Sequence, residues 1–486
     1  MARFLPSHSP TRQKTRKRRK NRKMKILFVY PDINVRGGAM SYQFGVGSLS
    51  ALLKAHGHET RLHYMFGKYD ADTLRNEIAS WHPDLIAFSA VSPQYQYVRR
   101  IFSELTPFPA FTILGGQHAT LAPDCLEEID GLQAVCVGEG EYPLLELANS
   151  LSSGKPDYAI KNIWFKTDGK IIRNETRPFL ENLDQLPFGD RELFDYQKIV
   201  DSDFNTALFM FSRGCPYDCT FCSNHALRLK QPGRYVRFRS VESALEEIKL
   251  VTRRYRMQAL YFNDDCFTAQ PSFTNEFCDR YPREFSLPFD INARPETLDD
   301  GVCRRLKAAG CRRVSIGIEN GSEQFRREVL GRNVSNDRIA AAFESCRRAG
   351  LKTKSFNIVG FPYETPEIFR ETVKINRRIL PDSVIIGVFE PYPGTKLAEV
   401  CLKEGFIAAG KPDECFAGRR DTMLEMPQFP RHEILKCFHN FAFNVYRKSM
   451  PLKAAFYHIY YSPAGEVVIR LLAPLKNFIR KFVMGV

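Results

Sequence analysis

This sequence of 486 residues has no long apolar run and no recognisable secretion signal, and it holds only 2 Trp. No stretch reads as about 18 uncharged apolar residues, so a membrane-spanning helix is not expected. A mean hydropathy of −0.32 with 44% hydrophobic residues is typical of a folded globular chain. At roughly 150 residues per domain, the length predicts two to four domains.

Acidic residues are missing from residues 1–25, which hold eleven Lys or Arg side chains. Beyond them, 59 basic residues face 55 acidic ones, so only +4 of the total charge of +15 belongs to the rest of the chain. Like charge at this density predicts a disordered basic tail over residues 1–24. Nucleic acid is therefore not favoured as a partner. The tail lacks the apolar core of a secretion signal, which predicts a cytoplasmic protein, and Met24 is an alternative start of translation.

Residues 25–150 alternate short β-branched or aromatic runs with amphipathic stretches, which predicts an α/β, Rossmann-like domain with a doubly wound parallel sheet. The expected strands are 25–31, 59–65, 84–92, 110–116 and 134–140, with helices over 45–57 and 71–82. Glycine or serine follows nearly every strand. Either these residues form tight turns only, or they line a ligand at the carboxyl edge of the sheet.

Residues 151–195 read as a linker with a hairpin around 163–172. A second alternation occupies residues 196–400, with strands expected at 206–212, 258–263, 287–293, 312–318, 352–359 and 383–389. Six βα units predict a partial (β/α)6 TIM-like barrel rather than a complete barrel. Residues 401–486 predict a small helical region. Its last amphipathic segment either packs on the protein or makes peripheral contact with an anionic membrane.

Three of the thirteen cysteines stand out by their spacing, Cys215, Cys219 and Cys222, directly after the first strand of the expected barrel. A zinc ion with His225 as fourth ligand is one reading, but structural zinc sites usually pair two CxxC knuckles and no second one is present. An iron–sulfur cubane that transfers electrons takes four thiolates. Three thiolates in one loop therefore predict a cluster with one open iron that can bind a substrate.

CxxxCxxC after strand one of a partial barrel resembles the radical S-adenosylmethionine (SAM) superfamily, over about residues 190–400. The resemblance implies a [4Fe-4S] cluster held by the three cysteines, which reductively cleaves SAM to a 5′-deoxyadenosyl radical. It also implies SAM contacts by Phe221, Asp264, Arg294 and Glu319. From the residues alone, a core aromatic, a turn or a surface salt bridge would explain these positions as well.

The N-terminal pattern resembles the cobalamin-binding domain fused to many radical SAM proteins. Where the better-known fold carries DxHxxG, with His as lower cobalt ligand, this chain has Asn34, and an amide is a poor cobalt ligand. The departure means either cobalamin bound without a lower protein ligand, which we favour, or a domain that no longer binds it. The resemblance implies cobalamin contacts by Asn34, Ser89, Gly115, Gly116, Gln117, Gly138, Glu139 and Gly140.

Together these resemblances predict a cobalamin-dependent radical SAM methyltransferase that methylates an unactivated carbon of a small molecule, natural-product or lipid-like. An external electron donor of flavodoxin or ferredoxin type is expected as a partner. A radical rearrangement or cyclisation without methyl transfer is the alternative within the same class. A non-catalytic iron–sulfur or zinc sensor is the alternative of another class.

Overall fold

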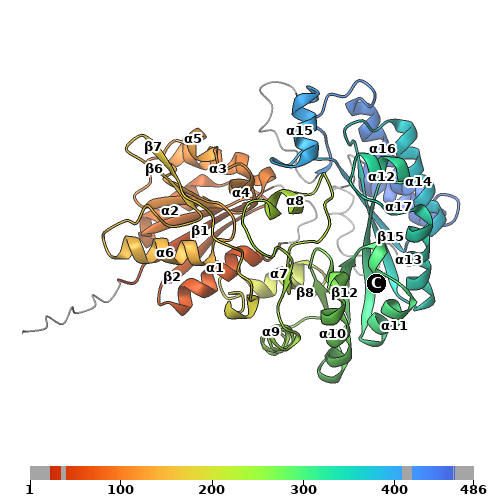
Figure 1. The fold of residues 1–486 in the computed structure, drawn as a ribbon, viewed down its shortest axis with the longest axis horizontal. Helices are drawn as coiled ribbons and strands as arrows, with labels where there is room; N and C mark the ends of the chain where they lie inside the picture. The colour runs from red at the N-terminus through yellow and green to blue at the C-terminus, as the bar shows by residue number, and fades with distance from the viewer. Residues whose placement is uncertain (1–21, 34–39, 408–418, 463–464, 466–486) are drawn as a thin grey trace, which may run out of the picture.

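Two α/β units lie side by side in the computed structural model of the chain (Figure 1). The structure describes residues 22–33, 40–407, 419–462 and 465. The N-terminal unit contains a seven-stranded sheet, called sheet A here, and the central unit contains a six-stranded sheet, called sheet B. Within the described residues, no helix combines the length and apolar content that crossing a bilayer requires.

Sheet A consists of β1 (Lys25–Asp32), β2 (Glu59–Phe66), β3 (Leu85–Ser89), β4 (Phe111–Gly115), β5 (Ala134–Cys136), β6 (Ile163–Thr167) and β7 (Lys170–Arg173). Their order is β2-β1-β3-β4-β5-β6-β7. The first five strands are parallel to their neighbours. The β6–β7 hairpin, which the sequence placed in a linker, adds to the sheet antiparallel to β5.

Helices cover both faces of sheet A. They are α1 (Phe44–Ala55), α2 (Ala71–Trp81), α3 (Ser92–Leu105), α4 (Gln117–Leu121), α5 (Cys125–Glu128) and α6 (Glu141–Ser152). Successive residues of β1 point to opposite faces, so Ile26 and Phe28 share a core with α1 and α6, whereas Leu27 and Val29 share one with α2 and α3. The uninterrupted apolar run of β1 follows from this burial on both sides. The sequence did not predict α3 and α6.

Sheet B consists of β8 (Thr206–Phe209), β11 (Ala259–Phe262), β12 (Phe289–Ala293), β13 (Cys311–Glu319), β14 (Lys352–Val359) and β15 (Ser383–Val388). The strands pair in sequence order and all in parallel. They form a curled half barrel that is open between β8 and β15 (Figure 1). A separate short ladder joins β9 (Ser212–Arg213) to β10 (Arg237–Phe238).

Helices precede β8 or connect the strands of the half barrel, and several of them pack on its outer face. They are α7 (Tyr196–Ser202), α8 (Ser223–Arg228), α9 (Val241–Arg254), α10 (Pro271–Glu284), α11 (Asp300–Ala308), α12 (Glu323–Glu328), α13 (Asn336–Arg348) and α14 (Pro366–Ile379), with short 3-10 turns at Leu183–Gln185, Phe267–Ala269 and Pro295–Thr297. Ser240, Asp299, Ser335 and Thr365 cap α9, α11, α13 and α14, each accepting a hydrogen bond from a first-turn backbone N–H. Such caps satisfy donors that the helix itself leaves unpaired.

Three further helices follow, α15 (Lys396–Lys403), α16 (Arg431–Tyr446) and α17 (Pro451–Tyr461). α16 packs on α14, β15 and α17, and its buried side chains share one core cluster with β14 and β15. The C-terminal helices therefore lie against the β15 side of the half barrel (Figure 1). The predicted amphipathic segment near the C-terminus lies outside the described residues, as does most of the basic tail.

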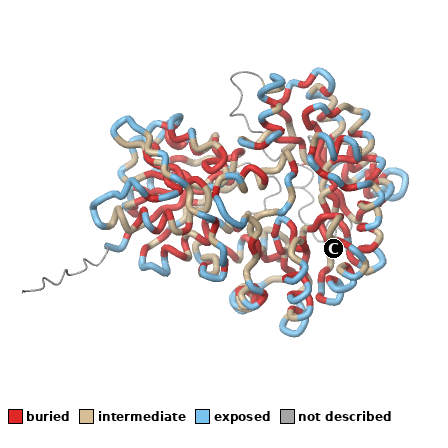
Figure 2. The backbone as a smooth tube through the Cα atoms, viewed as in Figure 1, coloured by how far each residue is buried: buried red, intermediate tan, exposed pale blue. Residues whose placement is uncertain are grey.

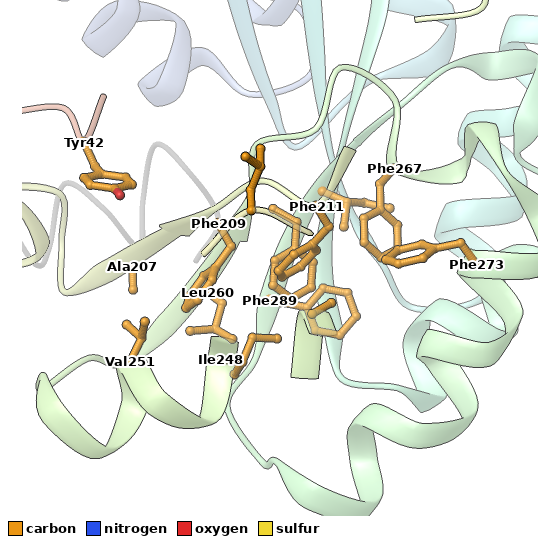
Figure 3. Packing of buried hydrophobic residues seen from close by; sticks show 14 of the residues in the cluster. Tyr42, Ala207, Phe209, Phe211, Ile248, Val251, Leu260, Phe267, Phe273 and Phe289 are labelled. Carbon is orange, nitrogen blue, oxygen red and sulfur yellow. The ribbon is translucent and has the colours of Figure 1, made fainter. Parts of the chain in front are cut away.

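One hydrophobic core runs through both units. Buried segments lie in the interior of both units, and exposed loops surround them (Figure 2). Figure 3 shows Phe211, Phe267, Phe273 and Phe289 packed together in the half barrel, with Tyr42 of the N-terminal unit to the left of them in the same cluster. Because residues from both units belong to the same cluster, the two units are held in a fixed relation.

Candidate cluster and cofactor site

The three cysteines lie in the loop between β9 and α8, at the carboxyl end of sheet B. Gly214 begins this loop with a φ of +85°, and a Cβ there would lie 2.7 Å from the Tyr235 carbonyl oxygen. Only glycine fits this backbone conformation and this space. The tight start turns the following residues, Cys215 to Cys222, back over the mouth of the half barrel.

All three thiols are free, and two of them accept a hydrogen bond from a polar side chain. Cys219 is buried, and its Sγ accepts a hydrogen bond from Arg294 Nη1 at 3.2 Å. Cys222 Sγ accepts one from Asn224 Nδ2 at 3.6 Å. Burial raises the pKa of the Cys215 thiol to about 12, so a thiolate here requires a cationic centre beside it. Iron supplies such a charge, and three thiolates are the ligand set that a cubane with one open iron takes.

No group of three or more His, Cys, Asp or Glu side chains surrounds a position for a single metal ion in the part of the chain that the structure describes. His225, the possible fourth ligand of the alternative zinc reading, is turned toward α15, where its Nε2 accepts a hydrogen bond from the Lys396 backbone N–H at 3.2 Å. A cubane spreads its thiolates over separate irons, whereas one zinc ion gathers all its ligands. His225 is thus engaged with α15 and is not placed as a fourth ligand beside the three thiols.

Arg294 ends β12 and faces the cysteine loop. Its guanidinium lies 3.6 Å from the ring centre of Tyr217 and forms an ion pair with Glu296 at 2.6 Å. Together with the hydrogen bond to Cys219, these contacts hold Arg294 against the cluster loop. The predicted contact between Arg294 and SAM stays a prediction.

Asp264 follows β11 and supports the backbone that leads into the cysteine loop. Its Oδ1 accepts hydrogen bonds from the backbone N–H of Phe211 at 2.9 Å, and from the backbone N–H and hydroxyl of Ser212 at 2.6 and 2.5 Å. Burial outweighs these hydrogen bonds and raises the pKa of Asp264 to about 6. The structure therefore gives Asp264 a positioning role, and its predicted contact with SAM stays untested.

Glu319 and Phe221 lie at the same mouth. Glu319 ends β13 with a left-handed φ of +66°, which is uncommon for a residue with a side chain, and its Oε1 is 3.4 Å from Arg332 Nη1. Burial raises the pKa of this carboxyl group, and Arg332 opposes the shift. Phe221 packs on Phe361 with ring centres 5.4 Å apart. Both positions are compatible with the predicted SAM contacts.

A cavity of about 290 Å³ opens at the carboxyl edge of sheet A, between the two units. Its lining from the N-terminal unit includes the predicted cobalamin residues Ser89, Gly115, Gly116, Gly138, Glu139 and Gly140. Its lining from the barrel includes Phe211, Ser212 and Arg213. Gln117 is not part of the lining, because its side-chain amide donates a hydrogen bond to the Ser223 hydroxyl of α8. Asn34 lies outside the described residues.

Two glycines and one tyrosine shape this cavity. A Cβ at Gly116, whose φ is +91°, would lie 2.7 Å from the Ala90 carbonyl oxygen, and one at Gly138 would lie 2.2 Å from Gln231 Oε1. The hydroxyl of Tyr42 is buried at the cavity and has no hydrogen-bond partner among the described residues. Protein atoms fill the space beside both glycines, so the close packing of this edge requires glycine at each position.

Glu139 joins the cavity to the cluster loop. Its carboxylate accepts hydrogen bonds from Arg213 at 2.8 Å and from Arg237 at 2.9 and 3.0 Å, and Arg213 also reaches Glu141 at 2.5 Å. Burial would raise the pKa of Glu139, but Arg213 and Arg237 outweigh it and lower the pKa to about 2. Because Arg213 is two residues before Cys215, one ion-pair cluster holds both sites together. The sequence analysis missed Glu141, Arg213 and Arg237, since no local pattern pairs charges so far apart in the chain.

Two family models match the chain. Residues 209–375 match the radical SAM superfamily, and residues 33–148 match the B12 binding domain. The first match contains the three cysteines, and the second contains the glycine-lined edge of sheet A. The matches confirm the predicted family resemblance, and with it the set of a [4Fe-4S] cluster, SAM and cobalamin.

Known proteins with related sequences or folds agree with these matches. An uncharacterized methyltransferase of Pyrococcus horikoshii is 27% identical over 79% of this chain and 84% of its own length. An anaerobic magnesium-protoporphyrin IX monomethyl ester cyclase of Rubrivivax gelatinosus is 26% identical over 77% of this chain and 69% of its own. The radical SAM methyltransferase TsrM of Kitasatospora setae, solved with cobalamin and a [4Fe-4S] cluster, has a TM-score of 0.65 at 17% identity, covering 79% of this chain and 75% of its own. The last likeness confirms the predicted fold class.

Proposed function

The chain is a radical SAM protein with an N-terminal B12-binding domain, and we propose that it is a cobalamin-dependent methyltransferase acting on an unactivated carbon of a small molecule. When bound, the cluster would supply the electron that cleaves SAM, and cobalamin would carry the methyl group. The chain positions these groups and excludes water from them.

The barrel residues hold and orient the cluster and SAM. Cys215, Cys219 and Cys222 bind the irons, and Arg294 donates a hydrogen bond to one of the ligating sulfurs. Asp264 fixes the loop that carries them. We propose that Glu319 accepts a hydrogen bond from a SAM hydroxyl and that Phe221 lies beside the adenine.

The residues of the N-terminal unit hold cobalamin. Gly115, Gly116, Gly138 and Gly140 let the ligand approach the backbone at the edge of sheet A. Ser89 and Glu139 supply polar groups there. Gln117 does not line the cavity, and its side-chain amide donates a hydrogen bond to Ser223 of α8. Asn34 in place of histidine supports cobalamin bound without a lower protein ligand.

The shared wall between the two sites carries this proposal. Arg213 lines the cavity at sheet A, bonds to Glu139 there, and lies two residues before Cys215. A methyl transfer that uses both cofactors needs them side by side at one substrate. Radical cyclisation without methyl transfer is the second candidate function, because one of the related proteins is named as a cyclase.

The test is an anaerobic reconstitution with iron, sulfide and cobalamin, followed by metal and corrin analysis. With a reductant and SAM labelled with deuterium on its methyl group, we expect 5′-deoxyadenosine and a product that carries the labelled methyl. Cys219→Ala should lose the cluster and the 5′-deoxyadenosine but keep the corrin. Formation of 5′-deoxyadenosine with an unlabelled product would support cyclisation, and bound zinc without 5′-deoxyadenosine would reject both reactions.

Partners and location extend the proposal. We propose that a flavodoxin or ferredoxin supplies the electron, because the cluster needs an external reductant. The cytoplasmic location and the peripheral membrane contact through the C-terminal segment also stay predictions, the latter because that segment lies outside the described residues.

A further inference from the structure

The inner face of sheet B is accessible to solvent. Along the strands, half-buried or exposed residues alternate with buried ones, and the register places them side by side on one face. They include Leu208 on β8, Tyr261 on β11, Asn292 on β12, Lys354 and Phe356 on β14, and Ile385 on β15. Ile385 keeps 40% of its surface exposed. Because helices pack on the outer face, these side chains point into the interior of the half barrel.

The register orders these side chains from the floor of the half barrel to its mouth. Lys354 is paired with Ser315, whereas Phe356 is paired with Ile385 one layer nearer the mouth. Glu319 at the mouth is paired with Asn357. Three residues separate Lys354 from that level, which is about 10 Å at roughly 3.3 Å per residue. A path from mouth to floor thus passes an apolar layer before it reaches an ammonium group.

No hydrogen bond or ion pair involves the Lys354 ammonium within residues 22–33, 40–407 and 419–462. Lys352, two residues earlier on the same strand, does have a partner, since its Nζ lies 3.0 Å from Asp382. Burial and the neighbouring Arg313 lower the pKa of Lys354 to about 7. Asp290 and Asp203 attract this ammonium group, but neither forms an ion pair with it among the described residues. A lysine in the interior without a directly bonded partner is costly unless a ligand supplies one.

Of the two carboxylates that act on Lys354, Asp290 is already engaged by arginine side chains. Asp290 is buried, and both of its oxygens are taken, by Arg312 at 2.7 and 3.0 Å and by Arg313 at 2.5 Å. Two guanidinium groups thus share one carboxylate. The local excess of positive charge adds to that of Lys354 and favours an anion in the interior.

We propose that the interior of the half barrel binds an amphiphilic anion as substrate, with its carboxylate or phosphate on Lys354 and its apolar part against Phe356 and Ile385. The inference rests on the proposed function, because it places the reacting carbon of the substrate at the mouth, beside the cluster and SAM. Lys354 acts here as a specificity-determining residue. It selects substrates with one acidic end and an apolar body.

The test measures binding without turnover. Octanoate combines a carboxylate with an apolar chain long enough to reach from Lys354 to the mouth, octyl phosphate offers the alternative acid, and 1-octanol lacks the charge. Each is titrated by calorimetry into the anaerobic holoprotein with SAM bound. We expect Lys354→Met to weaken the binding of octanoate or octyl phosphate about tenfold or more, because a hydrogen bond to a charged group is lost. Lys354→Arg should restore most of the affinity, and 1-octanol should bind all variants equally.

The matched control is Lys352→Met, which removes a lysine from the solvent-exposed start of the same strand, where it already has Asp382 as partner, and it should leave octanoate binding unchanged. Wild-type protein that binds neither acid, or binds 1-octanol as well as the acids, would overturn the proposal. So would unchanged acid binding in Lys354→Met. Corrin content and 5′-deoxyadenosine formation, measured on the same preparations, test the proposed function separately and show that the variants are folded.

Discussion

Replacing Glu139 by glutamine tests the ion-pair cluster that joins the two units. The carboxylate of Glu139 accepts hydrogen bonds from Arg213, Arg237 and the Leu180 backbone N–H. A glutamine side chain keeps the size but has only one accepting oxygen, and its NH₂ group would face a guanidinium. Arg213 keeps Glu141 as a partner, whereas Arg237 loses its only carboxylate partner among the described residues.

The magnitude follows from the pKa of Glu139, which falls from 4.5 to about 2 in the folded protein. At 1.36 kcal/mol per pKa unit, the ionised carboxylate contributes about 3 kcal/mol to stability. Because the folded pKa is depressed, this contribution is fully present above pH 4.5 and is lost as the pH falls toward 2. Glu139→Gln lacks it at every pH, so its deficit relative to wild type should shrink over that range.

Urea unfolding followed by tryptophan fluorescence is the assay. Both tryptophans, Trp81 on α2 and Trp164 on β6, belong to the N-terminal unit that contains Glu139, so their emission reports this unit. The control is Glu127→Gln, since Glu127 pairs with Arg173 at the surface and such pairs contribute only about 0 to 1 kcal/mol. If Glu139→Gln unfolded like this control at pH 7, the reasoning about the ion-pair cluster would be wrong.

Three further changes test other parts of the site. Arg294→Met should lower the midpoint potential of the cluster by about 60 mV, equal to about 1.4 kcal/mol for one electron, because it removes a hydrogen-bond donor from Cys219. An EPR-monitored redox titration measures this potential, and no shift would contradict the role of Arg294. Gly116→Ala should destabilise the N-terminal unit by about 1 to 3 kcal/mol in urea unfolding and reduce its corrin content, because Gly116 has a positive φ and an added Cβ would lie close to the Ala90 oxygen. A stable variant that still binds corrin would show that this position does not require glycine. Tyr42→Phe should leave the apoprotein as stable or up to about 1 kcal/mol more stable, because no described partner is lost; a clear loss in urea would point to a missed hydrogen bond.

The fold class could be predicted from the sequence, because its two alternations of strand and helix are strong local patterns. The strands around Cys215 and the glycine-rich ends of β4 and β5 were placed correctly for the same reason. The attachment of the β6–β7 hairpin to sheet A was not predictable, since it depends on a pairing of Val135 with Trp164 across a long connection. Register across such a distance leaves no local pattern.

The candidate site was predictable only where spacing or backbone chemistry marks it. CxxxCxxC and glycine turns are local, whereas the Glu139–Arg213 contact joins residues from two units. The sequence predicted Asp264 as a SAM contact. In the structure its buried carboxylate accepts hydrogen bonds from backbone N–H groups and so positions the chain that leads to the cysteine loop. Lys354 escaped notice because an isolated lysine in a strand looks like any surface lysine until the sheet is curled.

The strand order of sheet B has a consequence for synthesis on the ribosome. Every strand pairs with the one made just before it, so the half barrel can grow one βα unit at a time as the chain emerges. The nascent sheet nevertheless keeps an unpaired edge at β15 until α16 and α17 leave the exit tunnel and dock beside it. Ribosomes stalled before residue 431 should therefore display an intermediate that chaperones recognise and that full-length chains pass through only briefly.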